Sequence, residues 1–404
     1  PAIPEPDTIL VSPHSDKILF TSIALFSALS KASHTILYPP NISAALSSFT
    51  LTHCDVISIN GLNLLIFFVI LLGISSVLYS KKLTADYMYF AKNAFSVIVL
   101  GKYMMKRQPR NFCMMIGGIL SLWLLIDAFT WNIPGLGGKP GDIAFSCFLG
   151  TKTTITYYLL PALAFDYAFL MSFPRNKRLF ADTLLMMAIG GTIAYLIQMP
   201  ISTTIVCLIL QLLCMILVNK KTFIVKSIIK YGFLITSLLN ILLIAGGTLG
   251  FLDYIMVNVL GESSDLDGRR QIWTMVLATF SRRPLMGYGM GSDIIFNVWQ
   301  SNNASTHNYF LSILIYGGIV AIIVYLLLIL LFYKKNKPYS DRRISQFLML
   351  TLVIMNLEGI AENYGFNEMT VCFWVLIANI RCLYEWKSMM SGGNNETIGS
   401  HVRY

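Results

Sequence analysis

The residues best suited to chemistry gather in one polar stretch between two long apolar segments. The stretch contains one histidine, His307, and four arginines: Arg269, Arg270, Arg282 and Arg283. Guanidinium groups donate paired hydrogen bonds that suit phosphate or pyrophosphate oxygens, and imidazole exchanges a proton near neutral pH. This combination predicts a site that binds an anionic ligand and moves a proton.

Two helices are expected to position these residues. Residues 269–281 have apolar side chains at helical spacing, which predicts an amphipathic helix that lies in the membrane interface with its arginines at the start. His307 directly precedes an apolar helix, for which Ser305 or Thr306 is the expected cap. Between them, the glycines of PLMGYGMG (284–291) permit tight turns and close backbone approach.

The composition identifies a membrane protein. Hydrophobic residues make up 55% of the chain and charged residues only 12%, and the mean hydropathy is +0.65. We therefore expect an all-α fold, a polytopic transmembrane bundle of about 10–12 helices with one large external loop that carries short amphipathic helices. The predicted spans are residues 61–79, 87–104, 111–131, 150–172, 179–198, 200–218, 231–256, 308–333, 344–363 and 367–386.

The basic residues set the expected orientation. Four clusters occupy alternate loops, which is typical of cytoplasmic loops: residues 102–110, 175–178, 220–230 and 334–343. Lys81 and Lys82 lie on the opposite side, against this rule. The predicted organisation is an N-terminal segment with a possible first span (1–60), transmembrane helices (61–257), an external catalytic loop (258–307), further transmembrane helices (308–387) and a cytoplasmic tail (388–404).

Other site types receive little support. The formal charge of +10 comes from these loop clusters, so we expect no nucleic-acid partner. The seven cysteines are scattered, without the spacing of metal ligands or of a disulfide framework, and no metal or other cofactor is expected. Four acids near or within apolar spans are weaker functional candidates: Asp127, Asp166, Glu358 and Glu362. Glu358 and Glu362 are candidates for lining a glycan cavity or for pairing with the external arginines.

Three motifs in order carry a resemblance to a known family. They are GR-x-x-x-W from Gly268, P-L-x-G-Y-G-x-G from Pro284 and H-N-Y-F-L from His307, the last followed by Gly-Gly. Together they resemble the O-antigen ligase/polymerase superfamily of bacterial inner-membrane enzymes. The segment GTKTTITYYLLPALAF (150–165) is similar to one in capsular and exopolysaccharide polymerases.

The resemblance implies a glycosyltransferase that acts on an undecaprenyl-diphosphate-linked glycan at the periplasmic face, without a metal and with inversion at the anomeric carbon. Arg269 would neutralise the diphosphate leaving group, and His307 would orient or deprotonate the acceptor glycan. Arg270 and Lys152 would contact phosphate, and Arg282 and Arg283 would hold sugar or lipid headgroups. A flippase and a chain-length regulator are the implied partners within the lipid bilayer.

One departure from the family pattern bears on the reaction. Ligases carry an arginine in a Ser-Arg-Thr-like segment, whereas QMPISTTIVCL (198–208) has none. We therefore expect a polymerase of repeat units for capsule, exopolysaccharide or lipopolysaccharide O-antigen, with an O-antigen ligase acting on lipid A core as the alternative. A transporter or flippase is a further alternative, but the internal repeats typical of that class are not evident.

Overall fold

The fold is taken from a computed structural model, which describes residues 61–130, 146–173, 178–220, 222–246, 269–291, 294, 305–363 and 366–390. The possible span before residue 60, most of the loop between 247 and 304, and the tail after 390 lie outside these residues. The predictions made for those segments therefore remain predictions.

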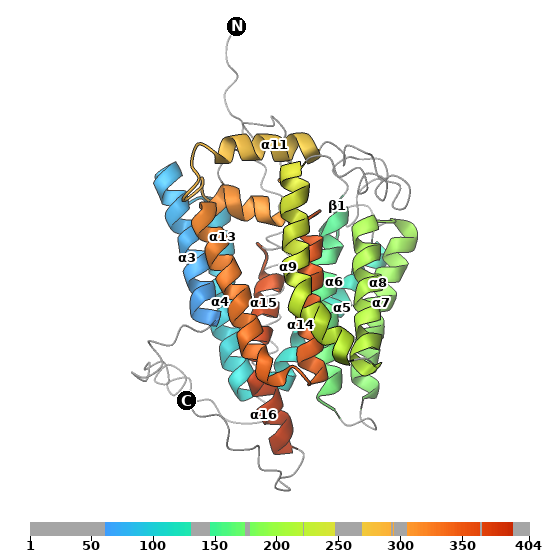
Figure 1. The fold of residues 1–404 in the computed structure, drawn as a ribbon. Helices are drawn as coiled ribbons and strands as arrows, with labels where there is room; N and C mark the ends of the chain where they lie inside the picture. The colour runs from blue at the N-terminus through green and yellow to red at the C-terminus, as the bar shows by residue number, and fades with distance from the viewer. Residues whose placement is uncertain are drawn as a thin grey trace, which may run out of the picture. The chain divides into compact units, whose positions relative to one another are not determined.

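The described chain is almost entirely helical, which confirms the all-α prediction (Figure 1). Its α-helices are α3 (Gly61–Ser80), α4 (Ala85–Arg107), α5 (Pro109–Thr130), α6 (Ile155–Met171), α7 (Leu179–Gln198), α8 (Ser202–Lys220), α9 (Thr222–Gly246), α11 (Arg269–Phe280), α13 (Tyr309–Asn336), α14 (Arg343–Glu358), α15 (Glu368–Ala378) and α16 (Ile380–Met390). The 3₁₀ helices η1 (Lys152–Thr154) and η3 (Lys337–Tyr339) complete them. Two short strands, β1 (Ser146–Cys147) and β2 (Gly150–Thr151), pair in antiparallel fashion.

Six described helices are long and apolar enough to cross a membrane: α3, α5, α7, α8, α9 and α13. The chain is thus a multi-pass membrane protein, as its composition predicts. The remaining predicted spans correspond to α4, α6, α14 and the pair α15–α16, which run alongside the others in the same bundle (Figure 1). These helices are shorter than the six long apolar helices or contain more charged residues.

Short apolar helices form the centre of the bundle. Nearly every residue of α6, α14 and α15 is buried, because apolar side chains surround each of these helices and bury against all of their neighbours. Polar side chains join the helices across this core: Thr156 to Thr204 at 2.7 Å, Gln211 to Thr351 at 2.6 Å and Ser121 to Asp166 at 2.5 Å. Such pairs satisfy groups that lipid cannot hydrate.

Several predicted helix boundaries are wrong. The span expected at 150–172 starts only at Ile155, because β1, β2 and η1 precede it. The helix expected from residue 231 begins at Thr222. The span expected at 344–363 ends at Glu358, and the one at 367–386 is interrupted at Asn379, where α15 ends and α16 begins. Apolar composition extends past the points where these backbones leave the helix, so composition alone misplaces the ends.

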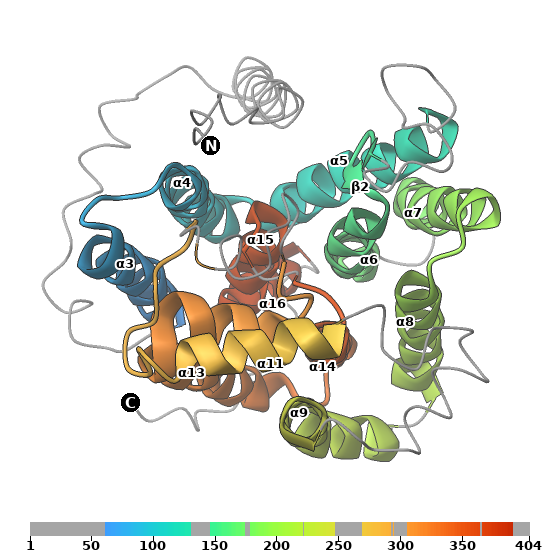
Figure 2. The ribbon, with the colours of Figure 1, turned by 90° about the horizontal axis from the view of Figure 1, so that it is seen from above.

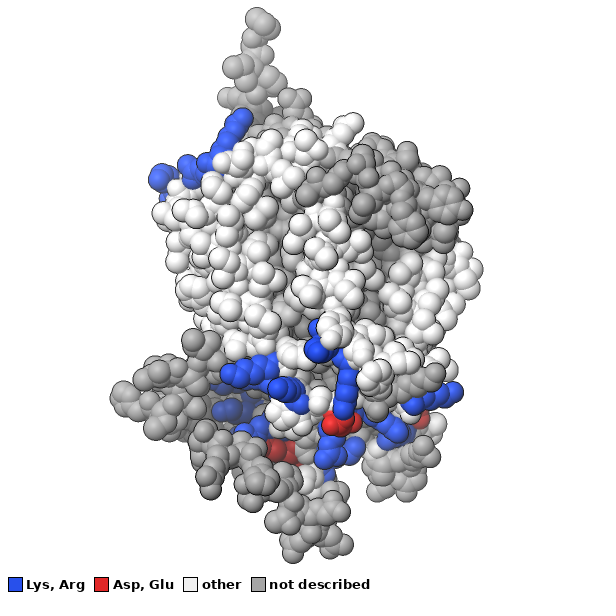
Figure 3. Space-filling model, in the orientation of Figure 1, with Lys and Arg blue, Asp and Glu red and all other residues white. Residues whose placement is uncertain are grey.

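The basic residues divide between the two ends of the bundle. The described residues of all four predicted clusters lie around the ends of α4, α6, α8 and α13 and the starts of α5, α7, α9 and α14. Figure 3 shows them as a belt at the lower end, and we call this the α16 end. The opposite end carries α11, together with a smaller group of exposed cations that includes Lys81 and Lys82 (Figures 1 and 3).

Candidate functional site

The amphipathic helix predicted at 269–281 is confirmed as α11, which lies across the end of the bundle (Figure 2). Its apolar face, Ile272, Trp273 and Val276, is buried against Leu311 and Ile315 of α13. The polar face of α11 points away from the bundle, as Gln271 and Thr274 are exposed. The helix therefore covers the first part of α13, and both belong to one layer.

Helix α13 is broken at Gly318, contrary to the single span expected at 308–333. Gly318 has φ 67° and ψ −163°, a backbone conformation that only glycine adopts easily. Residues 309–317 lie crosswise beneath α11, and residues 319–336 then run down the bundle (Figure 1). At 1.5 Å per residue, this second segment is about 27 Å long and can span the hydrocarbon core by itself.

The glycine-rich loop after α11 fills this break. Tyr288 N donates to Ile315 O and Gly289 N to Tyr316 O, both at 2.8 Å, and Ile319 N donates to Pro284 O at 2.8 Å. The loop thus pairs the backbone groups that the interrupted helix leaves unsatisfied. Its glycines have a structural role at this position, and the close backbone approach predicted from the sequence is confirmed.

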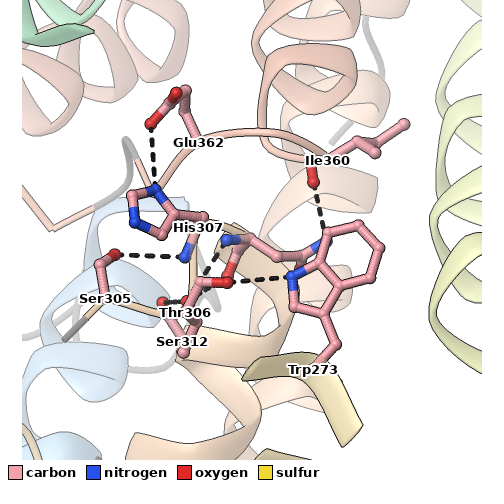
Figure 4. Close-up of polar contacts among 8 residues, drawn as sticks. Trp273, Ser305, Thr306, His307, Ser312, Ile360 and Glu362 are labelled. Atoms are coloured by element: carbon pink, nitrogen blue, oxygen red, sulfur yellow. Dashed lines mark hydrogen bonds and ion pairs between the residues drawn. The ribbon is translucent and has the colours of Figure 1, made fainter. Parts of the chain in front are cut away.

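A tight turn holds His307 at the start of the crosswise segment (Figure 4). The φ of His307 is 47°, in the left-handed region, which costs a residue with a Cβ about 1–2 kcal/mol. Its N–H donates to Ser305 Oγ at 3.2 Å, and Trp273 Nε1 of α11 donates to Thr306 O at 3.0 Å. The buried Thr306 hydroxyl lies 2.5 Å from Ser312 Oγ. The surrounding contacts therefore hold His307 in a conformation that its own backbone disfavours.

Asn308 caps the helix, not Ser305 or Thr306 as expected. Its Oδ1 accepts from Leu311 N at 3.0 Å, which is the usual N-cap contact. Its Nδ2 donates to Asn240 Oδ1 of α9 at 2.8 Å and to Ile360 O at 3.1 Å. One buried amide thus ties the His307 turn to two other parts of the bundle.

Glu362 faces the imidazole from the loop that follows α14. Its Oε2 lies 3.9 Å from His307 Nδ1, and only 3% of the Glu362 side chain is exposed, against 37% for His307 (Figure 4). Glu358, one helical turn earlier, is also buried, and its carboxyl oxygens have no hydrogen-bond partner among the described residues. The imidazole therefore has a buried carboxylate behind it and an accessible side in front.

The remaining predicted residues fall into two groups. Arg269 and Arg270 form the first turn of α11, and the bond from Trp273 to Thr306 places this end of the helix close to His307. Their side chains, like that of Lys152 in η1, lie outside the described part of the structure. Arg282 and Arg283 follow the other end of α11, at least about 10 Å farther along the helix axis than Trp273. They are not beside His307.

An apolar groove opens between α9 and α13 and has a volume of about 810 Å³. Leu277 of α11 and Phe310 of α13 line its upper end, and Lys230 and Tyr333 line the end nearer the basic belt. Met349, Leu352 and Val353 of α14 also line it. The groove thus leads along the bundle to the layer that contains the His307 turn.

Sequence reasoning missed the residues that support His307. Asn240 and Asn308 are buried amides within or beside apolar helices, and Asn308 stands directly before a helical run, which is a recognisable N-cap signal. Glu358 was identified as an acid in a span, but its place in the site depends on where α14 ends. The 3.9 Å approach of Glu362 to His307 joins residues 55 positions apart and has no local signal.

Comparison with known proteins supports the resemblance over part of the chain. Residues 186–326 match a family model described as O-Antigen ligase. The matched region includes α11, the glycine-rich loop, His307 and most of α13, but neither Lys152 nor Glu362. No curated protein matches the chain. The match agrees with the order of motifs around Arg269 and His307 and supports the resemblance of this part of the chain to the O-antigen ligase/polymerase superfamily.

Proposed function

We propose that the protein is a membrane glycosyltransferase that polymerises undecaprenyl-diphosphate-linked oligosaccharide repeat units. The observation that carries this proposal is the His307 turn. An exposed imidazole lies at 3.9 Å from a buried carboxylate, and the same turn is bonded to the helix that begins with Arg269 and Arg270. A base and a source of positive charge are the two groups that transfer from a lipid diphosphate requires.

The proposed reaction is a direct displacement. The acceptor hydroxyl oxygen forms a bond to the anomeric carbon of the donor sugar, and the bond from that carbon to the diphosphate oxygen breaks. The hydroxyl proton passes to His307, and undecaprenyl diphosphate leaves with the electron pair. In this scheme Glu362 stabilises the imidazolium, and the product sugar has the opposite anomeric configuration. No metal is required.

The basic residues at the start of α11 are assigned to the leaving group. Negative charge on the diphosphate increases as the glycosidic bond breaks, so a fixed guanidinium lowers the energy of the transition state more than that of the ground state. We assign Arg269 to this role, with Arg270 and Lys152 as further phosphate contacts. The positive end of the α11 helix dipole, at its N-terminus, supports the same assignment.

The apolar groove supports a lipid-linked donor. A polyprenyl chain needs a continuous apolar surface that is open to the bilayer, and the groove between α9 and α13 provides one directly below the α11 layer. A donor in this groove would present its diphosphate at the height of α11 and His307. A soluble nucleotide-sugar donor would have no use for such a surface.

The polymerase assignment rests on the start of α8 and on the segment 150–165, which is similar to one in capsular and exopolysaccharide polymerases. The corresponding segment in ligases has an arginine, whereas the start of α8 has Ser202, Thr203 and Thr204. The second candidate, transfer of the glycan to lipid A core, is favoured by the description of the matched family model as O-Antigen ligase. The two reactions share the donor and differ in the acceptor.

The test is complementation of a strain that lacks the gene, followed by gel analysis of its surface polysaccharide. Single repeat units left on the lipid carrier in the deletion strain would support the polymerase, and full-length polymer trapped on the carrier would support the ligase. Wild-type protein restores the product, and we expect His307→Ala to restore less than about 1% of it, since a positioned base contributes a factor of about 10²–10⁴. Normal product from His307→Ala at equal membrane abundance would contradict the proposal.

We also propose that the α11 end faces the periplasm or exterior of a bacterial inner membrane. The basic belt at the α16 end supports this orientation, because positively charged loops remain in the cytoplasm. The donor must be flipped to the outer leaflet before use, which makes a flippase a functional partner. A chain-length regulator is the second proposed partner.

A further inference from the structure

Four exposed cations form a separate cluster at the α11 end of the bundle. Lys81 and Lys82 follow the last residue of α3, and Arg282 and Arg283 follow α11. Figure 3 shows cations grouped at this end, well away from the basic belt. We call these four residues the cation cluster. Topology does not explain it, since positive charge is usually depleted at the end opposite the belt.

The two segments that carry the cluster are fixed to each other. Thr84 Oγ1 donates to Met290 O at 2.6 Å, and Ser76 Oγ donates to Lys82 O at 3.3 Å. Gly289, with φ 84°, packs directly on the backbone of Ser76, and a Cβ at this position would clash with it. The cations therefore belong to one surface, although about 200 residues separate the two pairs in sequence.

The charges of the cluster are available for a ligand. The Arg283 guanidinium carbon lies 4.8 Å from the centre of the Tyr79 ring and 5.8 Å from that of Tyr288, so aromatic faces hold it while its N–H groups stay open. Within the described residues, none of the four cations forms an ion pair with a carboxylate. Lys81 Nζ makes one long contact, 3.5 Å to Leu78 O.

An apolar stripe leads along α3 to the cluster. Phe67, Ile70, Ile74 and Leu78 are each 43–50% exposed and recur every three or four residues, so they share one side of a helix that is long enough to span a membrane. Lys81 follows Leu78 by about one turn. The cluster therefore lies where a lipid packed along this stripe would place its headgroup.

We propose that the cation cluster binds the phosphate headgroup of an anionic glycerophospholipid, whose acyl chains lie along the exposed stripe of α3. The side chain of Leu285, 65% exposed beside Arg283, adds apolar surface at the same level. Paired cations above an apolar face match a phospholipid in both charge and polarity, whereas a free anion would leave the stripe unused. The site is separate from the His307 turn and does not depend on the proposed reaction.

Native mass spectrometry of the full chain, purified in neutral detergent, tests the proposal. We expect phosphatidylglycerol to bind more tightly than phosphatidylcholine. Arg282→Gln with Arg283→Gln should weaken phosphatidylglycerol binding about 25-fold, because each cation near an anionic lipid surface contributes a factor of about five. Lys106→Gln with Arg107→Gln removes the same charge from exposed positions at the α16 end and should leave this affinity unchanged.

Three results would overturn the proposal: equal binding of the two lipids, an equal loss in the control, or complete displacement of the lipid by millimolar inorganic phosphate. The last result would identify a simple anion site. If the double arginine variant does not purify as a single species, Lys81→Gln with Lys82→Gln, on the other segment, replaces it with the same expected loss.

Discussion

His307 illustrates how a functional side chain depends on its neighbours for its position. Its left-handed backbone conformation is maintained by Ser305, Thr306 and Asn308, and the bond from Trp273 connects the turn to α11. The histidine itself was evident from the sequence, because a titratable residue beside arginines in an apolar chain is unusual. Its supporting residues were not evident, because their contacts come from distant helices.

We predict that Glu362→Gln lowers product formation about ten- to a hundredfold while the protein still folds. Glutamine keeps the size of the side chain but removes the charge that stabilises the imidazolium, and interactions with a charged group contribute about 1.5–3 kcal/mol. Quantified gel analysis of the polysaccharide measures the change. Glu385→Gln, at an exposed carboxylate paired with Arg381, is the control and should have no effect. Wild-type output from Glu362→Gln would remove Glu362 from the mechanism.

Two substitutions at Asn308 separate its contacts. Asn308→Ala loses the cap to Leu311 N as well as the bonds to Asn240 and Ile360, and we expect it to cost about 1–3 kcal/mol of stability. Asn308→Asp keeps the cap acceptor but has no N–H to donate. Thermal unfolding in detergent compares the two variants. If the hydrogen bond to Asn240 of α9 contributes to stability, Asn308→Asp is also destabilised. Full wild-type stability of the aspartate variant would show that only the helix cap contributes.

At the scale of elements, the α11 layer depends on a break that the sequence suggests only weakly. Helical spacing predicted α11, because one apolar face over twelve residues is a strong signal. The Gly-Gly pair at 317–318 lies in a continuous apolar run, and composition alone therefore predicted one straight span. The loop that completes the break lies about 30 residues earlier, and such long-range backbone pairing leaves no periodic pattern.

Gly318→Ala should destabilise the protein by more than about 2 kcal/mol. Alanine is strained at φ 67°, and its Cβ would clash with the backbone carbonyl of Leu285. This carbonyl cannot move away without disrupting the hydrogen bonds between the glycine-rich loop and α13. The midpoint of thermal unfolding of the purified protein measures this loss. Gly190→Ala, in α7, meets no atom within 4 Å and should be neutral or slightly stabilising. Equal stability of the two variants would contradict the assigned role of the break.

At the scale of the whole molecule, the charge pattern was the most reliable guide. The four predicted basic clusters contribute residues to one end of the bundle, because alternate connections of antiparallel helices return to the same side. The number of independent long spans was harder to predict. Short, wholly buried helices such as α6 and α14 resemble membrane spans in composition, although neighbouring helices supply much of their apolar surroundings.

The orientation gives a direct prediction. Lys82→Cys, at the α11 end, should react with a membrane-impermeant maleimide in intact cells, whereas Arg107→Cys, at the other end of α4, should react only after the membrane is permeabilised. Labelling of the otherwise unchanged protein gives the background from its native cysteines. The reverse pattern would place α11 and His307 in the cytoplasm and would exclude a periplasmic glycosyltransferase.

The backbone bonds that join the 284–291 loop to α13 also imply a test by sequence comparison alone. These bonds use no side chain, so Leu285, Met286 and Met290 can vary freely in related chains. Three glycines cannot be replaced freely, namely Gly287, Gly289 and Gly318. Each has a positive φ, and a Cβ at each position would clash with neighbouring backbone atoms. A related chain without a glycine at position 318 should therefore also lack glycines at positions 287 and 289. This joint loss would identify relatives in which the helix that corresponds to α13 is continuous.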